Sequence, residues 1–308
     1  MTLEMLVGAS VFAATLRLAA PIALAALGGV TTERSGVTNI ALEGSMLVGC
    51  FFGVVAADRT HNVWIGLAIA IVAGVLLAGL HAYAAIALRA DQIVSGMALN
   101  ILALGLTTYL DYQMYGTTGT PADLPVLPDV QLGFLTGVPY VGDAIGSQNV
   151  MVWTMGVLVI LLQLFLFRTV GGLRLRAVGE HPRAAETVGI EVRRIRYAAV
   201  LASGALAALG GAYLSIAFLG SFNQNMTAGR GYIALAVVIC GRWRPFGALA
   251  FACLFGFSSA LAQRLPTFSE SGATLFQALP YVLTIIVVAG VIGRSRPPAA
   301  VGQPYTRE

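Results

Sequence analysis

The chain has 308 residues, of which 57% are hydrophobic and only 10% are charged, and its mean hydropathy is +0.82. Because soluble domains carry about 25% charged residues, this composition excludes an ordinary soluble protein. The formal net charge of +4 comes from 18 basic residues. All of them are arginines, and most lie between apolar segments, so they do not indicate a nucleic-acid-binding surface.

Nine apolar segments follow one another along the chain, and most are long enough to cross a hydrocarbon core of about 30 Å. They predict an all-α polytopic integral membrane protein with about nine transmembrane helices, within a range of eight to ten, in one domain of residues 1–308. The segments cover residues 5–29, 37–57, 62–88, 91–113, 148–167, 197–219, 229–241, 245–263 and 273–293.

Two of these segments are unusual. Segment 229–241 is too short for a full span and predicts a half-helix or a tilted span. Arg17 stands in the middle of the first segment. Either residues 1–16 lie along the membrane interface, or Arg17 faces the protein interior.

The arginines between the segments predict an orientation, because cytoplasmic loops are enriched in basic residues. Loop 168–196 holds seven arginines, whereas loop 114–147 holds no basic residue and contains several prolines and glycines. We therefore expect loop 168–196 and the tail 294–308 to be cytoplasmic. Loop 114–147 is expected to be an irregular external loop, either a solvated connector or a docking surface for an external partner.

The first polar motif lies in the glycine-rich stretch 27–49, which contains Asn39 and Glu43. These two residues are four apart, so on a helix they would share one face. A carboxylate inside a span normally faces the bundle interior or a water-filled path. We take both residues as candidates for the substrate pathway. The structural alternative is that Glu43 pairs with an arginine or caps a half-helix.

Two further polar motifs interrupt apolar helices. Ser95 and Asn100 lie in segment 90–105, where they either bond neighbouring helices or contact substrate. Aromatic and amide side chains also follow one another at the start of stretch 219–250, and this chemistry suits a sugar or a base as well as an ordinary turn. These side chains are Phe222, Asn223, Gln224 and Asn225. Within that stretch, GRGYIALA resembles SGVTNIALE of the first half, which suggests an internal repeat.

The arginine-rich loop 168–196 contains the motif VGEHPRAAETVGI at residues 178–190. Pro182 is placed to begin a helix and Gly189 to end it. Glu180 lies just before the start, where the helix dipole stabilises a negative charge. A short helix flanked by arginines at the membrane face is suited to act as a lever. Arginines alone would also serve to anchor anionic lipid.

Enzyme motifs do not occur in the sequence. It has no P-loop, no zinc-ligand spacing and no nucleophile elbow. His61, His81 and His181 are widely separated along the chain. The three cysteines fall in apolar segments with no metal-binding spacing. We expect neither an enzyme nor a metal site.

Four motifs together resemble the permease subunits of ABC importers, in the branch for nucleosides and simple sugars. This branch is related to the branched-chain amino acid and ribose permeases. The resemblance extends from about residue 17 to residue 293. The motifs are ERSGVTNIALEG (33–44), VSGMALN (94–100), AVGEHPRAAETVGI (177–190) and GRGYIALAVVICGRWRPFGALA (229–250).

The resemblance implies a multi-pass permease bundle in the bacterial inner membrane. It also implies a second, similar permease, two cytoplasmic ATPase subunits that use ATP and Mg²⁺, and an extracytoplasmic solute-binding protein. This chain itself would hold no cofactor. His181 stands where the family more often has asparagine. The resemblance assigns ATPase coupling to Gly179, Glu180, His181, Pro182, Arg183, Ala184, Ala185, Glu186 and Gly189.

Other classes of function remain open at the level of the sequence. A secondary transporter would use Glu43 as its proton-coupling carboxylate. An ABC permease for branched-chain amino acids is a second alternative. A membrane-embedded enzyme is disfavoured because the sequence shows no cluster of catalytic residues. A passive channel is a further alternative, which uptake of solute against a gradient would exclude.

Overall fold

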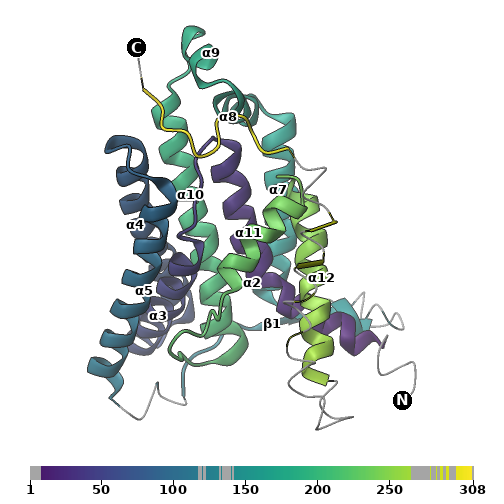
Figure 1. Ribbon diagram of the computed structural model, residues 1–308. Coiled ribbons are helices and arrows are strands. Elements are labelled where there is room, and N and C mark those ends of the chain that lie inside the picture. Colours follow the sequence, from purple (N-terminus) through teal and green to yellow (C-terminus); the bar gives the residue numbers. More distant parts are fainter. Residues whose placement is uncertain are drawn as a thin grey trace.

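The computed structural model describes residues 8–116, 120, 123–131, 133, 140, 142–264, 278, 282, 285–286, 289–290 and 296–306 (Figure 1). Within them the chain is almost entirely helical. The helices are α2 (Ala9–Arg34), α3 (Leu42–Thr60), α4 (Val63–Ala82), α5 (Gln92–Tyr115), α7 (Val150–Arg168), α8 (Val170–Glu180), α9 (Pro182–Thr187), α10 (Val192–Ala212), α11 (Arg230–Cys240) and α12 (Pro245–Arg264).

Six stretches of the described residues are long and apolar enough to cross a membrane. They are α2, α4 with its π-helical extension to Ala87, α5, α7, α10 with its π-helical extension to Leu219, and α12. Helix α3 has a similar length but carries three charged residues. The expected segment 273–293 lies outside the described residues, apart from isolated positions. The structure therefore supports an all-α membrane protein and does not confirm nine spans.

Helix α2 occupies the centre of the bundle, and every residue from Leu18 to Glu33 is buried. It packs against α10, α11, α12 and α7. Leucine, alanine and glycine supply most of this contact surface, so neighbouring helices approach from several sides. A helix buried all round is what a uniformly apolar sequence predicts.

Helices α3, α4 and α10 are held at very short separation by small residues. A Cβ added at Gly74 of α4 would lie 2.6 Å from the carbonyl oxygen of Gly204 in α10. A Cβ at Gly211 of α10 would lie 1.9 Å from the carbonyl oxygen of Met46 in α3. Small residues let helix backbones approach closely inside membranes, so these glycines fix how the three helices pack.

The chain is non-helical at two places inside the bundle. Residues 35–41 precede α3, and residues 220–229 precede α11. At 1.5 Å per residue, the 11 residues of α11 extend about 16 Å, roughly half of a ~30 Å hydrocarbon core. The predicted short segment 229–241 is therefore a half-helix. The span expected to begin at residue 37 begins instead at Leu42.

One end of the bundle collects most of the arginine-bearing segments, and we call it the arginine-rich end (top of Figure 1). It comprises residues 30–36, 168–196, 241–245 and 296–306. Arg34 donates through Nε to the carbonyl oxygen of Trp243 at 2.9 Å, and the Ala300 amide donates to the carbonyl oxygen of Gly179 at 2.9 Å. Segments that the charge pattern assigns to one side of the membrane thus lie together.

The opposite end carries a short antiparallel pair of strands, β1 (Asp129–Gln131) and β2 (Ser147–Asn149). Arg17 of α2 reaches this end, where its Nε donates to Oε1 of Gln148 at 3.1 Å. The side chain of Arg17 is exposed. Of the two alternatives for this segment, the one in which Arg17 faces the protein interior is therefore not observed. Instead, α2 is continuous from Ala9, and the arginine holds the strand pair.

Candidate functional site

The two non-helical stretches meet where Glu43, in the first turn of α3, caps the N-terminus of α11. Its Oε1 accepts hydrogen bonds from Oγ1 of Thr227 at 2.6 Å and from the amide of Gly229 at 2.8 Å. Its Oε2 accepts from the amide of Gly231 at 2.6 Å. Helix N-termini stabilise anions through such amides. The interpretation of Glu43 as the cap of a half-helix is confirmed.

Glycine at position 231 makes this contact possible. A Cβ added there would lie 2.5 Å from both the Cα and the amide nitrogen of Glu43. Any side chain would force the two helix starts apart. The GRGY motif is therefore explained by the close approach of α3 and α11, and the carboxylate of Glu43 is buried as a consequence.

Asn100 joins three separate parts of the chain at the same place. Its Oδ1 accepts from the Gly44 amide at 2.8 Å, and its Nδ2 donates to the carbonyl oxygen of Ile40 and to the hydroxyl of Tyr232, both at 3.0 Å. A buried amide with all these partners holds α5 against the non-helical stretch 35–41, the start of α3 and the start of α11. Its role in fixing the helices is visible directly in these bonds.

Asn39 lies beside this network in the non-helical stretch before α3. Its Nδ2 donates to Oγ of Ser203 at 3.0 Å, and its Oδ1 accepts from the Ala41 amide at 3.0 Å. This local turn is typical of asparagine ahead of a helix. The expectation that Asn39 and Glu43 share a helical face was wrong, because only Glu43 is helical. We define the half-helix junction as Asn39, Glu43, Asn100, Thr227, Gly229, Gly231 and Tyr232.

Ser95 is not part of the half-helix junction. Its Oγ lies 3.2 Å from Nδ1 of His81, whose Nε2 lies 3.0 Å from the carbonyl oxygen of Thr38. These contacts tie α4 and α5 to the start of the non-helical stretch 35–41. Ser95 therefore bonds neighbouring elements, which is the structural alternative for this residue.

The four residues 222–225 are also separate from the half-helix junction. The ring of Phe222 is buried edge-to-face against Phe51, with ring centroids 5.2 Å apart. Asn223, Gln224 and Asn225 are exposed in the turn that leads to α11. In this conformation the buried face of Phe222 is not available for stacking on a solute.

Thr227 and Tyr232 are the residues of this region that the sequence pattern did not single out. Tyr232 lies inside the GRGYIALA motif and Thr227 lies two residues before it. The resemblance of this motif to SGVTNIALE pointed to a pair of related segments. The two segments lie at neighbouring helix starts, although residues 35–41 are non-helical and residues 230–236 are the first turns of α11. The similarity of the two segments was therefore the sequence feature that could have pointed to Thr227 and Tyr232.

The predicted helix of the arginine-rich loop is present as α9. Pro182 is its first residue, and Gly189 follows its end with a left-handed φ of 83°. Glu180 lies just before the start of α9, as expected, but it is also the last residue of a separate helix, α8, that the sequence did not predict. Gly179 packs so closely on α2 that an added Cβ would lie 2.1 Å from the carbonyl oxygen of Arg34.

Comparison with known protein families gives a match over residues 11–288 to the family described as branched-chain amino acid transport system / permease component. The chain belongs to this permease family. It is 40% identical to the guanosine ABC transporter permease protein NupQ of Bacillus subtilis, over 96% of this chain and 95% of that protein. It is 37% identical to the nucleoside ABC transporter permease protein NupC of Lactococcus lactis, over 93% of each chain.

A third similar protein is the putative glucose ABC transporter permease protein TsgC13 of Haloferax volcanii, with 35% identity over 96% of this chain and 97% of that protein. Weaker similarity extends to NupP of B. subtilis at 26% identity and to NupB of L. lactis at 24%. These similarities identify the permease as a subunit of an ABC transport system. No solved structure matches the chain.

The surface of α9 in this permease divides into an inner and an outer face. Ala185 is only 4% exposed and packs with Val178, Val192 and Tyr305, and Glu186 accepts a hydrogen bond from the hydroxyl of Tyr305. On the outer side, Ala184 is exposed and Val188 is 74% exposed. Ala184 and Val188 therefore lie on the exposed outer side of this segment, whereas Ala185 and Glu186 contact the rest of the chain.

Proposed function

We propose that this permease is one of two different membrane subunits of an ATP-driven importer for nucleosides. The observation that carries this proposal is the pairing among its relatives. Three organisms each have a pair of permeases with the same named solute, and in each pair one member is more similar to this chain: 40% against 26% identity, 37% against 24%, and 35% against 27%. The first two pairs are named for guanosine or nucleosides and the third for glucose, and the higher identities are to members of the nucleoside pairs. The second member of such a pair is the partner we expect.

The proposed solute pathway runs along the open side of the half-helix junction. Tyr232 is 41% exposed there, beside the side-chain amide of Asn100 and the sulfur of Met97, which is 3.8 Å from the tyrosine hydroxyl. A flat ring next to an amide is suited to stack on a base and to bond a hydroxyl or ring nitrogen. Tyr232 takes the role that the sequence assigned to Phe222, and a partner permease would close the other side.

The energy for transport comes from partner subunits in this proposal. ATPase subunits that bind ATP and Mg²⁺ would dock on α9 from the cytoplasm, so the arginine-rich end would be cytoplasmic. A solute-binding protein would deliver nucleoside at the opposite end. Closure of the ATPase dimer would move α9, and through it α8 and α10. This chain contributes contacts that differ between the two states of the transporter.

The geometry does not favour Glu43 as a proton-coupling carboxylate. Its two oxygens accept hydrogen bonds from one hydroxyl and two backbone amides. Because both amides belong to the start of α11, they stay bonded to the carboxyl group unless α11 moves. These bonds give Glu43 a structural role as the cap of α11.

Docking of the ATPase is expected to depend on Val188. Replacing Val188 by Glu puts a charge at the most exposed part of the outer face, and the importer should lose most of its ATPase during affinity purification of the tagged permease. Val188→Ala is the matched control, because it shortens the side chain without adding charge, and it should retain the ATPase. Retention by both variants would contradict docking at α9. Ala185 and Glu186 are poor choices here, since changing them disturbs the inner face.

Selection of nucleosides is expected to depend on the ring of Tyr232. Loss of base stacking costs about 1–3 kcal/mol, so Tyr232→Ala should raise the KM for guanosine uptake by about tenfold. Tyr232→Phe keeps the ring and should change KM much less. The measurement is ATP-driven uptake of labelled guanosine by vesicles containing the full importer, with unlabelled glucose as competitor. Efficient competition by glucose, with no effect of Tyr232→Ala, would instead favour a sugar importer.

A further inference from the structure

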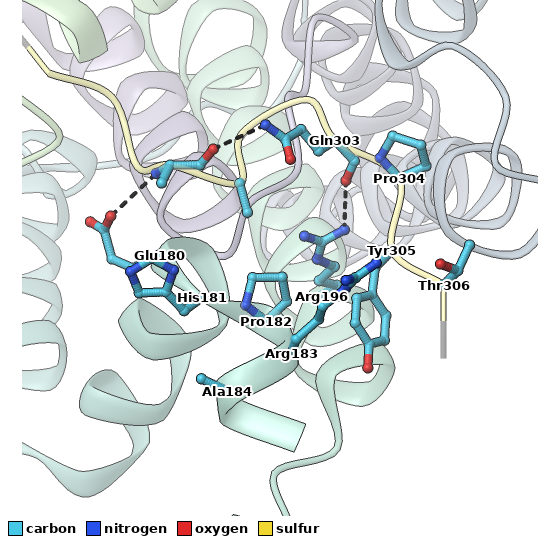
Figure 2. Close-up of a pocket in the computed structure, with 12 residues that line it drawn as sticks. Glu180, His181, Pro182, Arg183, Ala184, Arg196, Gln303, Pro304, Tyr305 and Thr306 are labelled. Carbon is cyan, nitrogen blue, oxygen red and sulfur yellow. Dashed lines mark hydrogen bonds between the residues drawn. The ribbon is translucent and has the colours of Figure 1, made fainter. Parts of the chain in front are cut away.

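The last described segment of the chain, residues 296–306, crosses the arginine-rich end and contacts the corner between α8 and α9 (Figure 2). We call this segment the C-terminal strap. The amide of Ala300 donates to the carbonyl oxygen of Gly179 at 2.9 Å, and the amide of Ala299 donates to Oε2 of Glu180 at 3.2 Å. The strap thus bonds to the last two residues of α8, directly before α9 begins.

Arg196 in α10 anchors the middle of the strap. It is a charged side chain that is only 2% exposed, and its Nη1 donates to the carbonyl oxygen of Gln303 at 3.0 Å. Its guanidinium also lies over the ring of Tyr305, 5.8 Å from the centroid, a favourable cation–π distance. A buried arginine requires compensation, and the strap supplies part of it through Gln303 and Tyr305. Among the described residues, Nε and Nη2 of Arg196 have no hydrogen-bond partner. The strap therefore covers Arg196 as well as α8.

Tyr305 connects the strap to α9 itself. The hydroxyl of Tyr305 donates a hydrogen bond to the carboxylate of Glu186, and its ring packs with Ala185, Val178 and Val192. These contacts involve the inner face of α9. Figure 2 shows Tyr305 and Arg196 side by side below the strap, facing the α9 segment.

Helix α9 depends on such contacts for its position. It has only six residues, and isolated helices shorter than about 12 residues are marginal in water. An open pocket of about 500 Å³ lies between the start of α9 and the strap, so close packing on this side of α9 is confined to the cluster that Ala185 forms with Val178, Val192 and Tyr305. The contacts of the strap therefore hold the helix across that space.

We propose that the C-terminal strap positions α9 for the ATPase subunit, with Tyr305 as the positioning residue. The ATPase-docking surface is then formed by two parts of the chain that are more than a hundred residues apart in sequence. This inference rests on the proposed function, in which α9 receives the ATPase. It goes beyond that function by assigning part of the coupling to the C-terminal strap.

The first test measures amide hydrogen exchange of residues 183–190 in the purified importer. Losing one hydrogen bond and the ring contact should lower protection by about tenfold in Tyr305→Ala, and losing the hydrogen bond alone should lower it by about threefold in Tyr305→Phe. Glu186→Gln keeps an acceptor for the hydroxyl and should stay near the native value. Thr306→Ala is the matched control, because its exposed side chain makes no hydrogen bond within the described part of the chain.

The second test measures, for the same variants, the ATPase recovered per permease and the solute-stimulated ATP turnover per recovered complex. Both values should fall in Tyr305→Phe and fall further in Tyr305→Ala, while the midpoint of thermal unfolding changes little. Unchanged amide protection would overturn the proposal, and so would tighter ATPase binding by Tyr305→Ala, since the strap would then oppose docking.

The outcome with Val188→Glu separates this inference from the proposed function. If Val188→Glu releases the ATPase but both Tyr305 variants behave as native, only the role of the C-terminal strap is wrong. If Val188→Glu also retains the ATPase, docking at α9 itself is wrong. In that case reduced exchange protection in Tyr305→Ala would show a contact that stabilises α9 without a role in coupling.

Discussion

Replacing Glu43 by Ala is expected to destabilise the permease by about 3–5 kcal/mol, because breaking a buried, charged hydrogen-bond network by removing one partner has a cost of this order. The substitution leaves the hydroxyl of Thr227 and the amides of Gly229 and Gly231 without their acceptor. It also removes the side chain that caps the N-terminus of α11. Uptake should be lost, since the position of the half-helix depends on this cap.

The measurement is the thermal unfolding midpoint of the importer in detergent, together with ATP-driven uptake in vesicles. Glu43→Gln is the informative companion variant. Its side-chain oxygen still accepts hydrogen bonds, but its NH2 group, which is a donor, faces a donor that the second oxygen of Glu43 had accepted from. We therefore expect intermediate stability and reduced uptake. A proton-coupling carboxylate would behave differently, because Glu43→Gln would then abolish uptake at nearly native stability. That result would contradict the structural role of Glu43.

Replacing Gly204 by Ala is the second substitution with a large expected effect. The added Cβ would lie 2.3 Å from Cβ of Ala78 and 2.5 Å from the carbonyl oxygen of Gly74, both in α4. Backbone atoms cannot give way as a flexible side chain can. Overpacking of this kind typically costs about 1–3 kcal/mol, and we expect the upper part of that range because α4 must move away from α10.

Gly105→Ala is the matched control for this experiment. Gly105 is also inside a long helix, α5, but an added Cβ there would have no neighbour within 4 Å. Alanine is favoured over glycine in a helix by about 1 kcal/mol, so this variant should be neutral or slightly more stable. Yield of folded protein and thermal midpoint should separate the two variants. Equal behaviour would show that α4 and α10 are packed less tightly than the structure describes.

Several features were predictable because they depend on local sequence. The long apolar stretches predict the helices, and the length of segment 229–241 correctly predicts the half-helix α11. Pro182 and Gly189 mark the ends of α9, because proline has no amide to donate and glycine adopts a left-handed φ without strain. The resemblance of four motifs led to the correct family.

Other features depend on contacts between distant residues, and the sequence does not reveal those. Glu43 and Gly231 are bonded across 188 positions, so the pattern showed a polar residue in a span without its partner. The same applies to Arg196, whose backbone partner Gln303 lies 107 positions away. Phe222 looked available for stacking, and Ala185 looked available for docking, because burial of single side chains is decided by elements elsewhere in the chain.

The close packing of α3, α4 and α10 has a mechanical consequence for transport. Glycines seated against backbone carbonyl groups interlock these three helices, so none of them can slide along or rotate against another without a collision. They must travel as one rigid block when the transporter changes which side of the membrane is open. The start of α11 is seated against the same block, because Gly231 lies against the backbone of Glu43 in α3. Any movement of α11 relative to the block would therefore have to open this contact together with the hydrogen bonds of Glu43.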